Sequence, residues 1–155
     1  MASQAETFLV VVDNTPECRK ARRFAALRAR RTGGQVTLLY PLEPPQFQQW
    51  GGVQDILAAE AEDAARAALA IEAAAVEELL GAPPQTRIRE GTPTHAVQAE
   101  LEADPSIRAL VLAANSGTNP GPLVNFFSSG KAGDLQCVVI IVPGALADER
   151  LDQLT

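Results

Sequence analysis

Residues 107–143 read IRALVLAANSGTNPGPLVNFFSSGKAGDLQCVVIIVP, and this stretch decides the fold. Its two ends, residues 107–113 and 137–142, are short apolar runs of the kind found in strands that are buried on both faces of a sheet. Between them we expect a loop of small residues over 114–122 and a helix from about 122 to 135. A strand, a helix and a second strand in this order predict parallel pairing.

The same alternation extends towards the N-terminus. We predict strands over 8–12, 35–40 and 86–90, the last a polar strand suited to a sheet edge, and an irregular loop over 41–52. We predict three helices in this part of the chain. The first begins with Thr15 as N-cap and Pro16 as its first helical residue, the second follows the irregular loop, and the third begins at Thr92. The chain is therefore predicted to be an α/β protein with a mostly parallel sheet and helices on both faces.

Length and composition indicate one domain. The 155 residues suffice for one core, which we place at about 7–143, followed by a polar, loosely held tail over 144–155. The net charge of −6 argues against nucleic-acid binding. No apolar run is long enough to span a membrane, and the N-terminus lacks the features of a signal peptide, so we expect a cytoplasmic protein. The two cysteines form no metal-binding pattern.

Basic residues are concentrated in the first predicted helix. We expect them to form a solvated helix face, and the alternative is a docking surface for an acidic partner. Seven of the thirteen basic residues lie there: Arg19, Lys20, Arg22, Arg23, Arg28, Arg30 and Arg31.

Candidate binding residues follow two of the predicted strands. Asp13 ends the first strand, where it would hydrogen-bond a ribose or base, hold a metal, or cap the next helix. The segment after 113 offers hydroxyl groups, glycines and one cation, which suit phosphate binding near a helix N-terminus but are also common in turns. The hydroxyl and amide groups belong to Asn115, Ser116, Thr118, Ser128 and Ser129, the glycines are Gly117, Gly121 and Gly130, and the cation is Lys131.

Sequence motifs of several enzyme classes are missing. The chain contains no GxGxxG after the first strand, no GxxxxGK[ST] and no GxSxG, which disfavours dinucleotide-binding, P-loop and α/β-hydrolase enzymes. We therefore assign no catalytic and no metal-binding residue.

The chain resembles the universal stress protein family over about residues 7–143. The matching pieces are Val12–Asp13, the segment from Asn14 to Glu17, the strand Gln35–Leu42, Glu90–Pro93 and the final strand. The resemblance implies an adenine-nucleotide α-hydrolase-like three-layer sandwich with strand order 3-2-1-4-5. It also implies a homodimer that pairs through the last strand, here Val138, Val139, Ile140, Ile141 and Val142.

ATP-binding members of this family carry a glycine pattern that is altered here. The pattern is Gly, two residues, Gly, nine residues, then Gly-Ser or Gly-Thr. The ungapped alignment puts Ala114 on the first glycine, Gly117 on the second and Phe127–Ser128 on the last pair. A two-residue insertion would put Ser129–Gly130 there instead. Tyr40 and Pro41 stand where the adenine would lie, with ATP and Mg²⁺ as the implied ligands.

These observations favour a homodimeric stress-response protein of the cytoplasm without catalytic activity, because phosphate binding needs glycines that are lost here. The first alternative is an ATP-binding switch or slow ATPase that uses Asp13, Gly117, Ser128 or Ser129, and Lys131. The second is an interaction module that docks a partner through the basic first helix. The protein partner stays unspecified.

Overall fold

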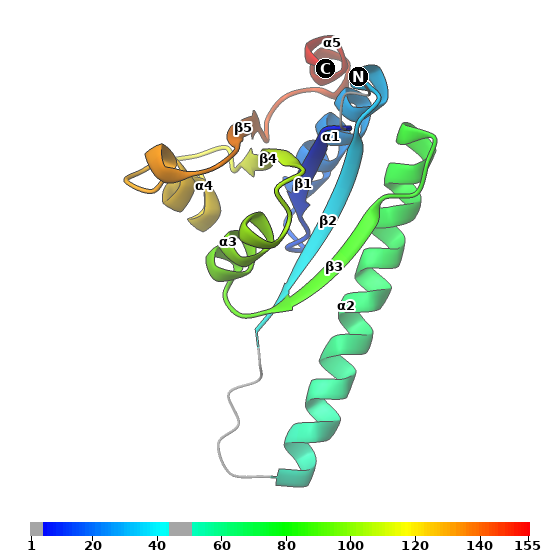
Figure 1. The fold of residues 1–155 in the computed structure, drawn as a ribbon, viewed down its shortest axis with the longest axis vertical. Helices are drawn as coiled ribbons and strands as arrows, with labels where there is room; N and C mark the ends of the chain where they lie inside the picture. Colours follow the sequence, from blue (N-terminus) through cyan, green and yellow to red (C-terminus); the bar gives the residue numbers. More distant parts are fainter. Residues whose placement is uncertain (1–4, 44–50) are drawn as a thin grey trace.

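The computed structural model describes residues 5–43 and 51–155, with side chains for all of these except 51–54. The predicted loop over 41–52 therefore lies mostly outside the described residues. Strands and helices alternate along the chain (Figure 1). Their bounds are β1 Thr7–Val11, α1 Cys18–Thr32, β2 Gln35–Leu42, α2 Gly51–Leu80, β3 Gln85–Glu90, α3 Pro93–Ala103, β4 Ile107–Ala114, α4 Pro122–Phe127, a 3-10 turn Ala132–Asp134, β5 Val138–Pro143 and α5 Asp148–Leu154.

The five strands form one parallel sheet in the order β3-β2-β1-β4-β5, as the resemblance implied. The central strand β1 pairs with β2 and β4, and all five of its residues are buried. The polar strand β3 lies at one edge, as its sequence predicted, and β5 lies at the other. Because all strands are parallel, their carboxyl ends meet at one side of the sheet.

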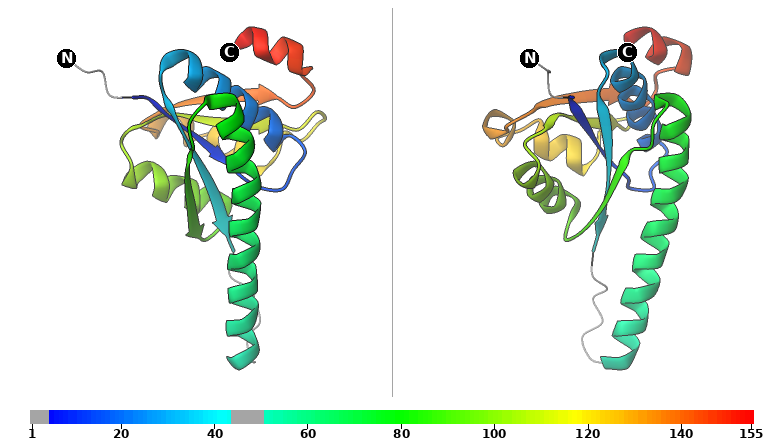
Figure 2. Two further views of the ribbon diagram at one scale, coloured as in Figure 1. Left: turned by 90° about the vertical axis from the view of Figure 1, so that its right-hand side faces the viewer. Right: turned by 45° about the vertical axis from the view of Figure 1, so that its right-hand side comes forward.

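Helices cover both faces of the sheet and complete a three-layer fold (Figures 1 and 2). One face packs against α1, α2 and α5, through residues such as Ala25, Val76 and Leu151. The other packs against α3 and α4, through Val97 and Phe127. The first half of α2 extends beyond the sheet (Figure 2). No helix in the described part of the chain is long and apolar enough to cross a membrane.

The predicted helix over 122–135 is wrong in its length. α4 ends at Phe127, and a separate 3-10 turn follows at Ala132–Asp134. The Ser129 hydroxyl donates to the carbonyl oxygen of Phe126 at 3.0 Å. Such a bond from a serine, followed by Gly130, competes with the helical backbone pattern and ends the helix.

The C-terminal tail is not loosely held. Residues 148–154 form α5, in which Leu151 is fully buried against the core. The basic face of α1 is correspondingly not simply solvated, because Arg19, Lys20 and Arg23 pair with acidic residues of α5. These three side chains thus contact acidic residues of the same chain.

Candidate functional site

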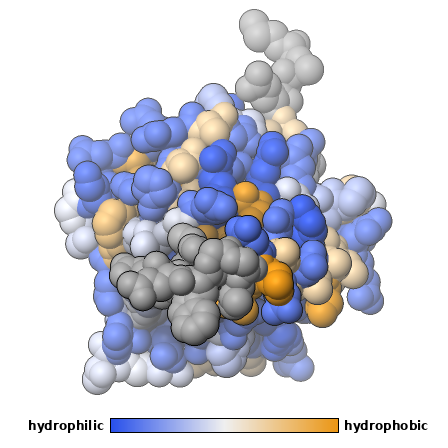
Figure 3. Space-filling view, turned by 90° about the horizontal axis from the view of Figure 1, so that it is seen from below, coloured by the Kyte–Doolittle hydropathy of each residue, from blue (hydrophilic) through white to orange (hydrophobic). Residues whose placement is uncertain are grey.

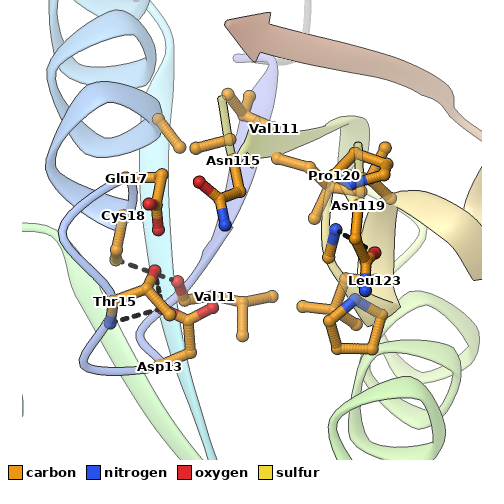
Figure 4. Close-up of a pocket in the computed structure, with 16 residues that line it drawn as sticks. Val11, Asp13, Thr15, Glu17, Cys18, Val111, Asn115, Asn119, Pro120 and Leu123 are labelled. Carbon is orange, nitrogen blue, oxygen red and sulfur yellow. Dashed lines mark hydrogen bonds between the residues drawn. The ribbon is translucent and has the colours of Figure 1, made fainter. Parts of the chain in front are cut away.

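A cleft of about 300 Å³ lies at the carboxyl ends of β1 and β4 (Figure 4). The segment from Asp13 to Cys18 forms one wall, and the loop and first turn of α4 form the other. Val11 and Val111 contribute apolar surface between the walls. This is the position in which open α/β sheets bind their ligands, outside the strand ends.

The wall between β1 and α1 is organised by Asp13. Its Oδ1 accepts hydrogen bonds from the Thr15 backbone N–H at 3.1 Å and from the Thr15 hydroxyl at 2.7 Å. This turn engages the hydroxyl that we expected to cap α1. The predicted helix start at Thr15 and Pro16 is therefore wrong, and α1 begins at Cys18 with Glu17 as N-cap.

Cys18 lies at the base of this wall. Its thiol donates to the carbonyl oxygen of Val11 at 3.2 Å and is buried beneath the first turn of α1. Burial raises the pKa of this thiol to about 12, so the group stays protonated at neutral pH. Cys18 thus serves as a packed, neutral side chain in the folded protein.

The opposite wall is a compact loop. The Asn115 backbone N–H donates to the carbonyl oxygen of Pro120 at 3.0 Å, which closes the loop at its base. The Asn119 side-chain oxygen accepts from the Gly121 N–H at 3.1 Å and from the Asn125 side-chain amide at 3.0 Å. The loop therefore satisfies some of its own donors, which an open phosphate-binding loop would direct at a ligand.

The electrostatic character of the cleft is acidic. Asp13 and Glu17 lie on one wall, and none of the sixteen described lining residues is lysine, arginine or histidine (Figure 4). A triphosphate carries several negative charges, which nearby carboxylates repel. In the absence of a neutralising cation, the side chains of the cleft thus favour a neutral or weakly charged ligand.

Phe127, which the ungapped alignment placed on the third glycine, belongs to the core. Its side chain is 1% exposed and packs with Leu123 and Val124 against the sheet. Phe126 meets its ring edge-on, with ring centroids 4.9 Å apart. The segment that would supply a flexible glycine loop is therefore a helical turn anchored by an aromatic ring.

The structure brings only some of the predicted site residues together. Asp13 lines the cleft, and Ala114 lies at the end of β4, where its carbonyl oxygen accepts from the Gly144 N–H at 2.7 Å. Gly117 is in the adjacent loop with φ of 145°, outside the lining set. Tyr40 and Pro41 belong to β2, and Tyr40 packs against the core beneath α1 and α2.

The other predicted residues follow α4 rather than precede it. Ser128 is the C-cap of this helix, and Ser129 and Gly130 are exposed just beyond it. Lys131 lines a separate hollow of about 230 Å³ together with Gln98 and Asp134. The cation and hydroxyl groups that the sequence suggested thus lie outside the cleft that contains Asp13.

Glu17 and Asn119 line the cleft but were missed as site residues. Each has a recognisable position in the sequence, because Glu17 comes four residues after the strand-ending Asp13 and Asn119 precedes Pro120–Gly121. The segments that follow the carboxyl ends of two parallel strands meet at one edge of the sheet, so their polar residues are candidates for a site. Both residues belong to such segments.

Seen from the side at which β2 ends, the surface is mostly hydrophilic with separate hydrophobic patches (Figure 3).

The edge strand β5 exposes two large apolar side chains to solvent. Val138 is 63% exposed and Ile141 is 41% exposed. An apolar edge strand carries unpaired backbone groups and favours association with another strand.

Solved structures of similar fold include several universal stress proteins. UspA from Lactobacillus plantarum is 22% identical, with a TM-score of 0.73 over 91% of this chain and 99% of that chain. A protein from Archaeoglobus fulgidus in complex with dAMP is 20% identical, with a TM-score of 0.53 over 90% and 99%. Another universal stress protein, in complex with cAMP, is 20% identical, with a TM-score of 0.50 over 92% and 100%. At these identities the likeness shows the fold.

The comparison of sequences gives the family. No curated protein sequence matches the chain. The sequence model of the universal stress protein family matches residues 5–143, which include all five strands and the cleft but not α5. The chain belongs to the universal stress protein family.

Proposed function

We propose that this protein is a non-catalytic, homodimeric universal stress protein of the cytoplasm whose cleft accepts the nucleoside part of an adenine nucleotide but does not retain a triphosphate. The observation that carries this proposal is the burial of Phe127 in the core at 1% exposure. A phosphate loop needs backbone that approaches the ligand closely, and a buried aromatic residue fixes this segment elsewhere.

The nucleoside part suits the cleft better than the phosphates do. Asp13 uses Oδ1 within its own turn, and among the described residues none donates to its Oδ2, which is then free to accept from a ribose hydroxyl. Val11 and Val111 offer apolar contact for a base. The complexes of related proteins with dAMP and cAMP support an adenine ligand with a single phosphate.

The homodimer is supported by the exposed apolar residues of β5, Val138 and Ile141. A second copy that packs against this edge would cover both side chains and would remove the exposed edge from solvent. ATP hydrolysis has less support, since the described lining of the cleft holds no cation to stabilise a phosphoryl group.

Isothermal titration of the nucleotide-free protein with adenosine, AMP, cAMP and ATP tests the proposal, each with and without Mg²⁺. We expect adenosine or a monophosphate to bind more tightly than ATP. An Asp13→Asn variant should weaken adenosine binding, whereas Lys131→Gln, outside the cleft, should leave it unchanged. Tighter binding of ATP than of AMP, or release of phosphate from ATP, would contradict the proposal.

A further inference from the structure

α5 lies outside the family match, which ends at residue 143, and is nevertheless docked on the domain. Figures 1 and 2 show it beside α1, at the same end of the molecule. Leu151 is fully buried and Thr155 is 4% exposed. A helix of seven residues does not form by itself in water, so its helical state depends on its contacts with α1.

α5 is held by ion pairs on either side of one buried leucine. Asp148 accepts hydrogen bonds from both terminal nitrogens of Arg19 at 3.1 Å and from the Lys20 ammonium group at 2.8 Å. Asp152 accepts two from Arg23 at 2.7 Å. The Asp148 side chain is 40% exposed and that of Asp152 is 38% exposed, so salt screens both pairs. Leu151 supplies the apolar anchor between them.

The segment before α5 is joined to the cleft. The Gly144 N–H donates to the carbonyl oxygen of Ala114, at the end of β4. A Cβ atom at Gly144 would lie 2.5 Å from that oxygen and 2.8 Å from Cγ of Glu17. Gly144 thus packs directly against a residue of the cleft wall.

Residues at the start of α1 take part both in the cleft wall and in the contact with α5. Glu17 and Cys18 line the cleft, and the next residues, Arg19 and Lys20, hold Asp148. From this arrangement we infer that α5 is an electrostatic latch that holds the first turn of α1 against the cleft, and that its release loosens this wall. The inference concerns the protein itself and does not depend on which ligand the cleft accepts.

Cys18 reports the state of this wall. It is 8% exposed, so a thiol reagent reaches it only when the first turn of α1 opens. The experiment uses the full chain with Cys137→Ala, which leaves one thiol, and follows the reaction with dithionitrobenzoate. Asp148→Asn/Asp152→Asn removes the latch charges. Glu77→Gln/Glu78→Gln, on α2, removes the same charge from exposed side chains that form no ion pair among the described residues.

We expect the latch variant to react about fivefold faster than the parent at low salt, and the control to react like the parent. Raising NaCl to about 0.5 M should accelerate the parent and reduce its difference from the latch variant. Equal rates for the latch and control variants would overturn the inference.

Global destabilisation could also accelerate the reaction, so urea unfolding of each variant is measured in parallel. A Cys18 rate that rises only in proportion to the global unfolding constant would also overturn the inference. The exchanged pair Arg23→Asp/Asp152→Arg provides a second criterion, because it should restore slow modification relative to either single change. Failure of the exchange to slow the reaction counts against the latch.

Discussion

The carboxylate of Glu100, on α3, accepts a hydrogen bond from Nε of Arg89, on the edge strand β3, at 2.5 Å. The two partners differ in burial, since the Glu100 side chain is 2% exposed and the Arg89 side chain is 33% exposed. Nε of Arg87 lies 3.6 Å from the second carboxylate oxygen. A buried acid on α3 thus holds a strand whose own sequence is mostly polar.

This asymmetry predicts unequal costs for removing the two partners. Arg89→Met leaves a buried carboxylate without its main partner and should lower the free energy of unfolding by about 3 kcal/mol. Glu100→Gln leaves an arginine that can reach water and should cost about 1 kcal/mol. Urea unfolding measures both. The double variant Arg89→Met/Glu100→Met should recover part of the loss, and a larger cost for Glu100→Gln would refute this account.

Phe127 should behave as a core residue rather than as a lost loop glycine. Phe127→Gly restores the residue of the ATP-binding pattern, but it removes a fully buried ring and should destabilise the protein by about 3–5 kcal/mol. Phe126→Ala, at a half-buried neighbour, should cost less. Thermal and urea unfolding test this order. A stable Phe127→Gly protein that gains ATP affinity would show instead that the loop retains its phosphate-binding form.

The alternation of strands and helices from β1 to β5 followed from the sequence because apolar periodicity reports burial directly. The strand order followed from the family resemblance. The details of the site did not follow, because they depend on competition between nearby polar groups. Asp13 engages the Thr15 hydroxyl and delays the start of α1, and the Ser129 hydroxyl helps to end α4 at Phe127.

The docking of the C-terminal segment was missed for a related reason. DERLDQL is too short and too polar to predict a bound helix from its composition. Its partner is the basic face of α1, which lies more than a hundred residues earlier in the chain. The excess of arginine and lysine in α1 was a visible signal, but only the fold shows that Asp148 and Asp152 meet it.

Introducing a cation into the cleft should raise its affinity for phosphates. Glu17→Lys replaces a carboxylate of the cleft wall with an ammonium group and should tighten ATP binding by about tenfold, since it removes a repulsion and adds an attraction. Glu78→Lys makes the same charge change at an exposed side chain of α2, outside the cleft, and serves as the control. Titration with ATP measures both. Equal ATP affinities in the two variants would contradict an electrostatic barrier at Glu17.

The latch should weaken in acid. The guanidinium of Arg19 and the ammonium of Lys20 hold the pKa of Asp148 well below its usual range, and Arg23 lowers the pKa of Asp152. A carboxylate whose folded pKa lies below its unfolded value stabilises the fold above that unfolded value, near pH 4, and loses this contribution as the pH falls.

Urea unfolding of the parent and of Asp148→Asn/Asp152→Asn tests this dependence. The parent should be the more stable of the two at neutral pH, and the difference should shrink below about pH 4 as the carboxylates are protonated. A difference that stays constant between pH 7 and pH 3 would mean that these charges do not hold α5.

The exposed edge of β5 should determine the oligomeric state. Ile141→Lys places a charge in the proposed dimer contact, where a buried ammonium group without a partner is costly, and should convert the dimer to a monomer. Ile71→Lys makes the same change on α2, at a side chain that is 70% exposed, and should leave the dimer intact. Light scattering coupled to gel filtration gives the mass of each variant. Dissociation by Ile71→Lys with an intact Ile141→Lys dimer would move the contact from β5 to α2.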